Sequence, residues 1–385
     1  DMQLKTFTEF QMVNEAQSSL RLNVPSDIID LHKLFQKNGK ELYIVGGAVR
    51  DAIMGKKPKD FDLATDAFPE EVVNMVQGAG YSTIGEVGQQ FGVVIVQIPS
   101  DKNGVEIATF REDLSGGRRP DAVKYSTIDK DVLRRDLTIN ALFYDIGRGE
   151  IVDLVGGLKD IQDQKIRTVG AAADRFAEDP LRKLRALRFA GRTGSKLEKE
   201  TADAILTDNS LEGVSPERIR DEFKKSIESA KKPVDYLNMV SHFSLWDIMF
   251  PNLVISTNFV NTNTWPIQLT HLFDMNSNDM IKKEMNRMTF TSDEVNAVVF
   301  LKNLRDLKPE NVFDLYKQWV TTKVDKDIIT QFAKINRLDL KQIKAFLKYK
   351  PTTDGNWVMR EFGVKGPQIA QKIKEIEAEK YKKTI

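Results

Sequence analysis

The stretch that decides the fold is Tyr43-Ile-Val-Gly-Gly-Ala-Val-Arg-Asp51, which is followed closely by Asp60-Phe-Asp62. Its first residues are aromatic or β-branched, which is typical of a short strand. Gly46 and Gly47 then predict a tight turn that leads into a helix. Free N–H groups at a helix start attract anions, so the stretch indicates a phosphate-binding strand, turn and helix. A Gly-Gly pair by itself is equally typical of an ordinary turn.

Asp60 and Asp62 are separated by a single residue. On a strand, residues i and i+2 point to the same side, so their carboxylates are expected to lie side by side. Two adjacent negative charges favour a cation, and Mg²⁺ prefers oxygen ligands that it shares with substrate phosphates. The alternative is a polar face on an edge strand. The Gly-Gly unit just upstream favours the metal site.

Glu106 is a third candidate carboxylate, in Val105-Glu-Ile-Ala-Thr109. Its apolar neighbours predict a strand, on which it could also be an ordinary solvent-facing residue. Together with Asp60 and Asp62 it would suffice for two Mg²⁺ ions. Such ions activate an attacking hydroxyl and stabilise a leaving pyrophosphate.

The residues around these motifs have an α/β pattern that later becomes entirely helical. Strands are predicted at residues 42–45, 61–64, 93–98 and 105–110, and a helix at residues 70–77. From Asp179 onward nearly every segment has helical periodicity, prolines separate the helices, and no convincing strand follows. The sequence therefore predicts an α+β head followed by a long helical region.

Composition narrows the possible functions. The chain has 385 residues, of which 41% are hydrophobic and 29% charged, as in a globular protein of two or more domains. The lack of cysteine excludes disulfides, thiolate nucleophiles and cysteine-ligated zinc, and it favours a cytoplasmic location. No stretch approaches the roughly 20 apolar residues of a membrane span, so no membrane partner is expected. With a net charge of +1, the chain cannot bind nucleic acid through its total charge, and such binding would need a local patch of basic residues.

The order of these motifs resembles the class II tRNA nucleotidyltransferases, the family of CCA-adding enzymes and bacterial poly(A) polymerases. The resemblance begins with Gly46-Gly-Ala-Val-Arg50-Asp51 and Asp60-Phe-Asp62. Four further stretches match in order, which makes chance a poor explanation. They are Phe110-Arg111 to Arg118-Arg119-Pro120, Arg134-Arg135-Asp136-Leu-Thr-Ile-Asn140-Ala141, Glu178-Asp179-Pro-Leu-Arg182 and Glu217-Arg218-Ile-Arg220-Asp-Glu222.

The resemblance implies a polymerase-β-like nucleotidyltransferase head with a mixed sheet, followed by an elongated all-helical neck, body and tail. The expected parts are an N-terminal extension at residues 1–22, the catalytic head at 23–165, the neck with nucleotide-base recognition at 166–230, the body at 231–330 and the tail at 331–385. The helical half is expected to hold RNA, because cationic stretches lie within residues 218–232 and 341–350.

The resemblance also implies roles for single residues. The metal ligands would be Asp60 and Asp62, with Glu106 as the third catalytic carboxylate. Contacts to the phosphates and sugar of the nucleotide would come from Gly47, Arg50 and Arg135. The incoming base would be read by Asp179 and Arg182, and the nucleotide site would be completed by Arg185 and Arg188.

The chemistry of an Asp–Arg pair fits this base-reading role. Cytosine and adenine both offer a ring acceptor to Arg and an amine donor to Asp. Uracil and guanine present an N–H where Arg also donates, so they are excluded by facing donors. A simpler alternative is that Asp179 caps a helix beginning at Pro180. In that case Arg182, Arg185 and Arg188 form a solvated stripe on one helix face.

The activity implied is addition of C, C and A to the 3′ end of tRNA from CTP and ATP, with two Mg²⁺ ions and release of pyrophosphate. No obligatory protein partner is evident. The loop of residues 112–117 is shorter than in many bacterial relatives, and in this family that loop is tied to the switch from CTP to ATP. A CC-adding, A-adding or poly(A)-adding relative therefore stays open, as does a non-catalytic RNA-binding protein on the same scaffold.

Overall fold

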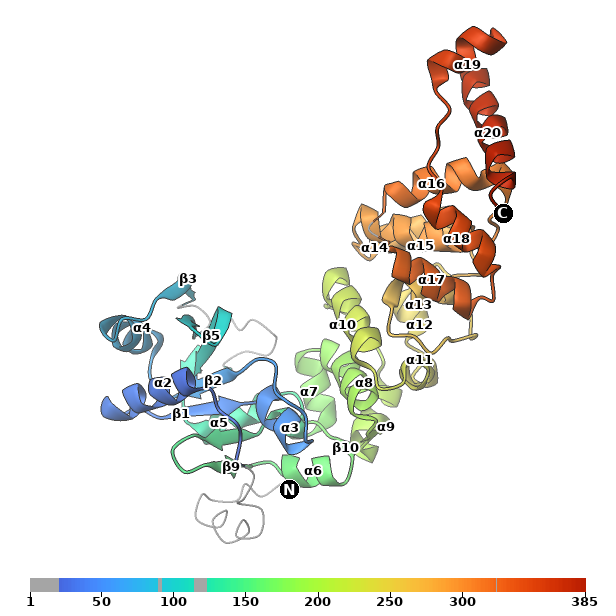
Figure 1. Ribbon diagram of the computed structural model, residues 1–385. Helices are drawn as coiled ribbons and strands as arrows, with labels where there is room; N and C mark the ends of the chain where they lie inside the picture. The colour runs from blue at the N-terminus through green and yellow to red at the C-terminus, as the bar shows by residue number, and fades with distance from the viewer. Residues whose placement is uncertain (1–20, 89–91, 114–122, 323) are drawn as a thin grey trace. The chain divides into compact units, whose positions relative to one another are not determined.

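The computed structural model describes residues 21–88, 92–113, 123–322 and 324–385. The chain forms two compact units, Asp1–Gly213 and Val214–Ile385 (Figure 1). The predicted extension lies outside the described residues up to residue 20, and so do Arg118 and most of the loop before it. None of the helices in the described ranges is long and apolar enough to cross a membrane.

A seven-stranded mixed sheet is the centre of the first unit, which confirms the predicted fold class of the head. Its order is β3-β4-β5-β2-β1-β8-β9. Strands β2 and β5 run parallel, and the other neighbours are antiparallel. The strands are β1 (Leu42–Val45), β2 (Asp62–Thr65), β3 (Thr83–Gly88), β4 (Val93–Ile98), β5 (Asp101–Thr109), β8 (Phe143–Asp145) and β9 (Glu150–Val152).

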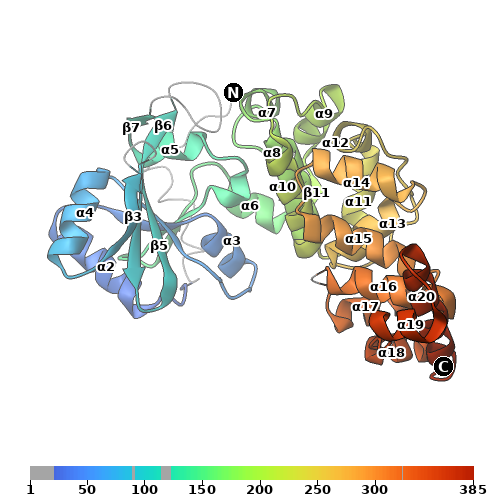
Figure 2. The ribbon, with the colours of Figure 1, turned by 90° about the horizontal axis from the view of Figure 1, so that it is seen from above.

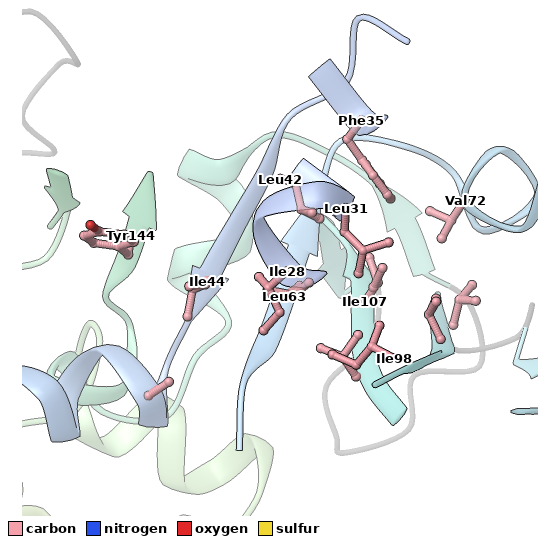
Figure 3. Packing of buried hydrophobic residues seen from close by; sticks show 14 of the residues in the cluster. Ile28, Leu31, Phe35, Leu42, Ile44, Leu63, Val72, Ile98, Ile107 and Tyr144 are labelled. Atoms are coloured by element: carbon pink, nitrogen blue, oxygen red, sulfur yellow. The ribbon is translucent and has the colours of Figure 1, made fainter. Parts of the chain in front are cut away.

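Both faces of this sheet are buried. Leu42 and Ile44 of β1 belong to a core that includes side chains of α2 (Ser26–Lys37) and α4 (Pro69–Gly78), as Figure 3 shows for Phe35. Tyr43 and Val45 belong to a second core on the opposite face. Successive strand residues point to opposite sides, so a continuous apolar run such as residues 42–45 matches a strand that is covered twice.

The predicted strands agree with the structure where the apolar run is long enough. Residues 42–45 and 93–98 are β1 and β4, whereas β2 begins one residue later than predicted and β5 begins at Asp101. Strands β8 and β9 were not predicted, because three residues are too few to show a period. A separate two-stranded ribbon is formed by β6 (Arg111–Asp113) and β7 (Val123–Tyr125).

The helices α5 (Ile128–Leu133), α7 (Ala172–Glu178), α8 (Leu181–Thr193) and α9 (Lys199–Thr207) also belong to the first unit. The expectation of no strand after Asp179 is wrong at one place. Strand β11 (Lys196–Leu197) pairs in parallel with β10 (Lys165–Ile166). Gly194 has a φ of 74° and ends α8 in a left-handed turn, which reverses the chain toward β10.

The second unit contains only helices among its described residues (Figure 2). Four of its α-helices have a proline in the first turn, where no N–H donor is needed. They are α10 (Pro216–Ser229), α11 (Pro233–His242), α13 (Trp265–Leu272) and α20 (Pro367–Lys382). A core of aromatic and aliphatic side chains joins α15 (Ser292–Leu304), α17 (Lys326–Ile335), α18 (Leu340–Lys348) and α20. The finer boundaries between neck, body and tail stay predictions.

Candidate active site

Two carboxylates lie side by side on the parallel strands β2 and β5. Asp62 opens β2 and is paired in register with Glu106 of β5. Their neighbours Leu63, Val105 and Ile107 are buried in the core on one face of the sheet. Asp62 and Glu106 therefore both point to the other face, and both are exposed to solvent.

Several charged groups lie near Asp62. The surrounding protein raises the pKa of Asp62 by disfavouring its charged form, and the charges of Glu106 and Asp60 raise it further, whereas Arg135 lowers it. Asp60 precedes β2 by two residues, so the strand geometry predicted for it is wrong. Its charge is nevertheless close enough to act on Asp62.

These carboxylates suit a metal that is shared with a substrate. Among the residues that the structure describes, no three carboxylate or imidazole groups are arranged to hold a metal on their own. Mg²⁺ usually takes only one or two protein carboxylates and completes its shell with water and substrate phosphates. The crowded pair Asp60 and Asp62 fits that kind of site, since a cation would relieve its repulsion.

The Gly-Gly turn lies next to Arg135. Strand β1 ends at Val45, which is paired in register with Asp62. Gly46 follows with a φ of 67°, a conformation that side chains disfavour. A Cβ at Gly46 would lie 3.8 Å from Nη1 of Arg135. Helix α3 (Gly47–Ile53) starts immediately after the turn, so the turn, Arg135 and Asp62 share one part of the first unit.

Arg135 is held by a buried carboxylate. Asp131 of α5 is 1% exposed and accepts hydrogen bonds from Nη2 of Arg135 at 2.9 Å and Nε of Arg134 at 2.8 Å. Burial raises the pKa of Asp131, but the charges of Arg135 and Arg134 outweigh it, so the net pKa is lowered. The guanidinium of Arg135 also lies 4.8 Å from the ring centre of Phe143. Asp131 therefore fixes the guanidinium of Arg135, whose positive charge acts on Asp62.

Arg50 is buried, with 2% of its surface exposed. Its Nε and Nη2 donate to Oδ1 of Asp51 at 2.9 and 2.7 Å, and its Nη1 donates to Oδ1 of Asn140. Burial lowers the pKa of Arg50, and the charge of Asp51 opposes that shift. Three of the five N–H groups of Arg50 are thus used by the protein itself, and its contact with nucleotide stays a prediction.

The arginines of α8 do not form a solvated stripe, so that alternative is wrong. Arg185 donates from Nε to Oδ2 of Asp136 at 2.7 Å, and its Nη2 forms an ion pair with the same oxygen at 2.7 Å. Burial raises the pKa of Asp136, but the charge of Arg185 outweighs it and the net pKa is lowered. Arg188 is 9% exposed and its guanidinium lies 4.3 Å from the ring centre of Phe189. This face of α8 packs against protein.

Asp179 and Arg182 lie at the start of α8. The helix begins at Leu181 and its N-cap is Pro180, one residue later than the capping alternative requires. Asp179 Oδ1 nevertheless accepts the N–H of Leu181 at 3.2 Å. The backbone N–H of Arg182 donates to the carbonyl of Asp179 at 2.9 Å, so the two residues are one turn apart.

The guanidinium of Arg182 joins this turn to the segment that carries Arg135. Its Nη1 donates to Oε2 of Glu178 at 2.7 Å, and its Nη2 donates to the carbonyl of Arg134 at 3.0 Å. Arg182, which is predicted to read the base, is therefore hydrogen-bonded to the residue just before Arg135, which is predicted to bind phosphate.

Three aspartates that hold these arginines were not predicted as site residues, namely Asp51, Asp131 and Asp136, and neither was Arg192, which pairs with Asp51. A signal existed for Asp51 and Asp136, because each follows an arginine within a quoted motif. Arg192 lacks such a signal, because its partner Asp51 is 141 residues away.

Comparison with known proteins gives two family matches. Residues 42–167 match the poly A polymerase head domain, and residues 194–255 match the probable RNA and SrmB-binding site of polymerase A. Together they include the carboxylates, the Gly-Gly turn and Arg135.

Three curated relatives match between 52% and 57% of this chain. A CCA-adding enzyme of Bacillus velezensis is 42% identical over 214 residues, which are 54% of this chain and 52% of that protein. The mitochondrial CCA tRNA nucleotidyltransferase 1 of Danio rerio is 40% identical over 52% of this chain and 47% of its own. Poly(A) polymerase I of Haemophilus influenzae is 35% identical over 57% of this chain and 50% of its own. The chain spans about half the length of the curated relatives it matches.

Solved structures share the fold over nearly the whole chain. The crystal structure of the Bacillus stearothermophilus CCA-adding enzyme in complex with CTP has a TM-score of 0.72 and 24% identity, and the match covers 91% of each chain. A CCA-adding enzyme in an apo form has a TM-score of 0.69 at 21% identity, covering 99% of this chain and 96% of that one. The helical second unit therefore has the fold of these structures.

Proposed function

Because this chain belongs to the family of CCA-adding enzymes and bacterial poly(A) polymerases, we propose that it adds C, C and A to the 3′ end of tRNA without a nucleic-acid template. CTP and ATP are its substrates, and pyrophosphate is released. The observation that carries this proposal is the register pair Asp62 and Glu106 beside the Gly46–Gly47 turn and Arg135.

In the transfer step the 3′ hydroxyl oxygen of the RNA forms a bond to the α-phosphorus. The bond from that phosphorus to the bridging oxygen breaks, pyrophosphate leaves and the hydroxyl proton passes to solvent. Asp60 and Asp62 would hold Mg²⁺ together with the nucleotide phosphates, and the bound metal would supply Lewis-acid stabilisation of the developing charge. Arg135, fixed by Asp131, orients the phosphates, while the glycine turn lets them approach the backbone closely.

The start of α8 selects the base. Asp179 accepts from the exocyclic amine of cytosine or adenine, and Arg182 donates to the ring nitrogen. The hydrogen bonds from Arg182 to Glu178 and to the carbonyl of Arg134 support this role, since they limit the positions of a long flexible side chain. In this account the protein takes the place of a template strand.

The C-terminal helices offer a surface for RNA. A hollow of about 560 Å³ is lined by side chains of α18, α20 and the segment that follows α18. Lys341, Lys344 and Lys348 occupy one face of α18, and Lys350 follows. These four ammonium groups have no acidic partner among the described residues. A concave surface with unpaired cations suits the phosphates of a folded RNA.

The other cationic stretch, within residues 218–232, is already paired in part. Arg220 is paired with Asp221 at 2.8 Å, and Lys224 is paired with Glu294. The charge of these groups is already balanced inside the second unit. Lys225, Lys231 and Lys232 of this stretch are exposed, so they are candidates for phosphate contacts beside the lysines of the hollow.

Replacing Lys341, Lys344 and Lys348 together by Gln is expected to weaken tRNA binding without changing the choice of nucleotide. Three lost phosphate contacts should reduce the salt dependence of log Kd by about 3 and lower affinity at low salt most. The measurement is a tRNA-binding isotherm at several salt concentrations. A matched triple variant, Lys282→Gln, Lys283→Gln and Lys308→Gln, removes the same charge from exposed positions elsewhere. Equal losses in both triple variants would show that the hollow has no special role.

The proposed activity is tested by incubating the protein and Mg²⁺ with tRNA that lacks its CCA end, offering each nucleoside triphosphate separately and then CTP with ATP. Addition of two residues with CTP alone, and of a third only when ATP is also present, is the expected result. Addition of C alone, of A alone, or of a long A tract would identify the corresponding relative instead. Binding of tRNA without any extension would support the non-catalytic alternative.

A further inference from the structure

A line of charged contacts runs from α3 to the end of α8. Asp51 uses one oxygen for both hydrogen bonds from Arg50, at 2.9 and 2.7 Å. Its other oxygen accepts from Nη2 of Arg192 at 2.7 Å. Asp51 thus bridges two guanidinium groups, one on the helix after the glycine turn and one on the last turn of α8.

A second line of contacts reaches the middle of the same helix. Arg50 donates to Oδ1 of Asn140, and Nδ2 of Asn140 donates to Oδ1 of Asp136 at 3.2 Å. Oδ2 of Asp136 accepts both donors of Arg185. Four side chains, those of Asp51, Arg50, Asn140 and Asp136, therefore connect Arg192 to Arg185.

Helix α8 closes these contacts into a ring. Arg185 and Arg192 are two turns apart and lie on the same helix face. Phe189 lies between them on that face, with the guanidinium of Arg50 at 4.8 Å and that of Arg185 at 5.8 Å from its ring centre. The ring of contacts thus fixes α8 to the head at Arg185 and Arg192, with the aromatic ring of Phe189 between them, in addition to the hydrogen bond from Arg182 to the carbonyl of Arg134.

The charged side chains of this ring are partly or almost fully buried, so their ion pairs can contribute to holding α8 in place. The side chain of Asp51 is 13% exposed and that of Arg50 only 3%, while Arg192 is 30% exposed. Exposed ion pairs contribute little, whereas removing one partner of a buried pair leaves a charge without compensation. Loss of Arg192 would leave Asp51 held from one side only.

We infer that Asp51 and Arg192 are positioning residues that set the distance between the base-reading start of α8 and the glycine turn. This rests on the proposed function, because it assigns the start of α8 to the base and the turn to the phosphates. Without the contact at Arg192, the C-terminal end of α8 loses its tie to α3, while Arg185 and the hydrogen bond from Arg182 to the carbonyl of Arg134 still hold the N-terminal half of the helix. A tilt of α8 about these remaining contacts changes the orientation of Asp179 and Arg182 relative to the phosphate site, and small displacements of positioned groups have large effects on transfer.

The test compares Asp51→Asn, Arg192→Gln and the double variant with the parent enzyme. We expect each single variant to raise the KM for CTP roughly tenfold, to change kcat by less than about threefold and to increase use of UTP. The double variant should be no worse than Asp51→Asn, because Arg192→Gln removes only a contact that Asp51→Asn already lacks. Arg192→Lys should restore part of the affinity. Arg148→Gln, at an exposed ion pair with Asp145, is the matched control.

A second readout does not depend on activity. Amide hydrogen exchange of peptides covering α8 should be faster in both single variants, and the double variant should match Asp51→Asn. Unchanged exchange, or single effects that add up in the double variant, would overturn the positioning role. A normal KM and nucleotide preference in an active parent background would overturn it as well. If the parent itself adds no nucleotide, the proposed function fails, and the exchange data alone decide whether the pair fixes α8.

Discussion

Asp62→Ala should abolish nucleotide addition, with a loss of at least about a thousandfold, because a metal ligand supplies several kcal/mol of transition-state stabilisation. Asp60→Ala should have a similar effect. Both side chains are exposed and outside the hydrophobic core, so unfolding temperature and tRNA affinity should stay close to those of the parent. The measurement is single-turnover extension of tRNA lacking its CCA end, with thermal unfolding and tRNA binding measured on the same preparations.

Asp30→Ala is the control for these variants. Asp30 is an exposed carboxylate on α2 that forms only a surface pair with Lys33, so its removal should leave the rate nearly unchanged. Transfer rates within tenfold of the parent for Asp62→Ala would exclude a metal-binding role for that residue. Raising the Mg²⁺ concentration should rescue neither variant fully, because the ligand itself has been removed.

Arg182→Ala should change which nucleotide is used, and not only the rate. The variant lacks the donor that faces the N–H of uracil and guanine, so incorporation of UTP or GTP should rise relative to CTP and ATP. A charged hydrogen bond contributes about 1.5–3 kcal/mol, so selectivity should relax by roughly one to two orders of magnitude. The same change breaks the contacts with Glu178 and the Arg134 carbonyl, so overall activity should fall as well.

Asp179→Asn separates base reading from capping. Asn accepts the N–H of Leu181 about as well as Asp does, so a pure capping role predicts a nearly silent variant. A base-reading role predicts altered nucleotide preference, since the amide is a weaker acceptor for the base amine. Lys199→Ala, at an exposed pair on α9, is the control. If neither Asp179→Asn nor Arg182→Ala shifts nucleotide preference, the base-reading role is excluded.

Much of the head could be predicted from the sequence because its signals are local. The apolar runs at residues 42–45 and 93–98 are bounded by glycine or proline and match β1 and β4. The three-residue strands β8 and β9 could not be found this way, although β8 is the neighbour of β1 in the sheet. Their pairing depends on the chain returning to β1 from about 100 residues away, which no local pattern encodes.

The candidate site was predictable where chemistry and spacing agree in a short stretch. Asp62, Glu106 and Arg135 lie in one part of the first unit, as the interpretation of the motifs required. The burial of Arg50 was not foreseeable, because its partner Asn140 is 90 residues distant in sequence. The capping alternative for Asp179 placed the helix one residue early, which is an ordinary error for a boundary next to proline.

We propose that this chain is an RNA nucleotidyltransferase whose own side chains choose the nucleotide. The most direct test supplies tRNA lacking its CCA end with an equal mixture of all four nucleoside triphosphates and Mg²⁺, followed by sequencing of the 3′ ends. The account predicts ends that finish in CCA, with U and G rare and no further extension. Ends that carry all four bases in similar proportion would contradict selection by the protein, and unextended ends would contradict the enzymatic activity itself.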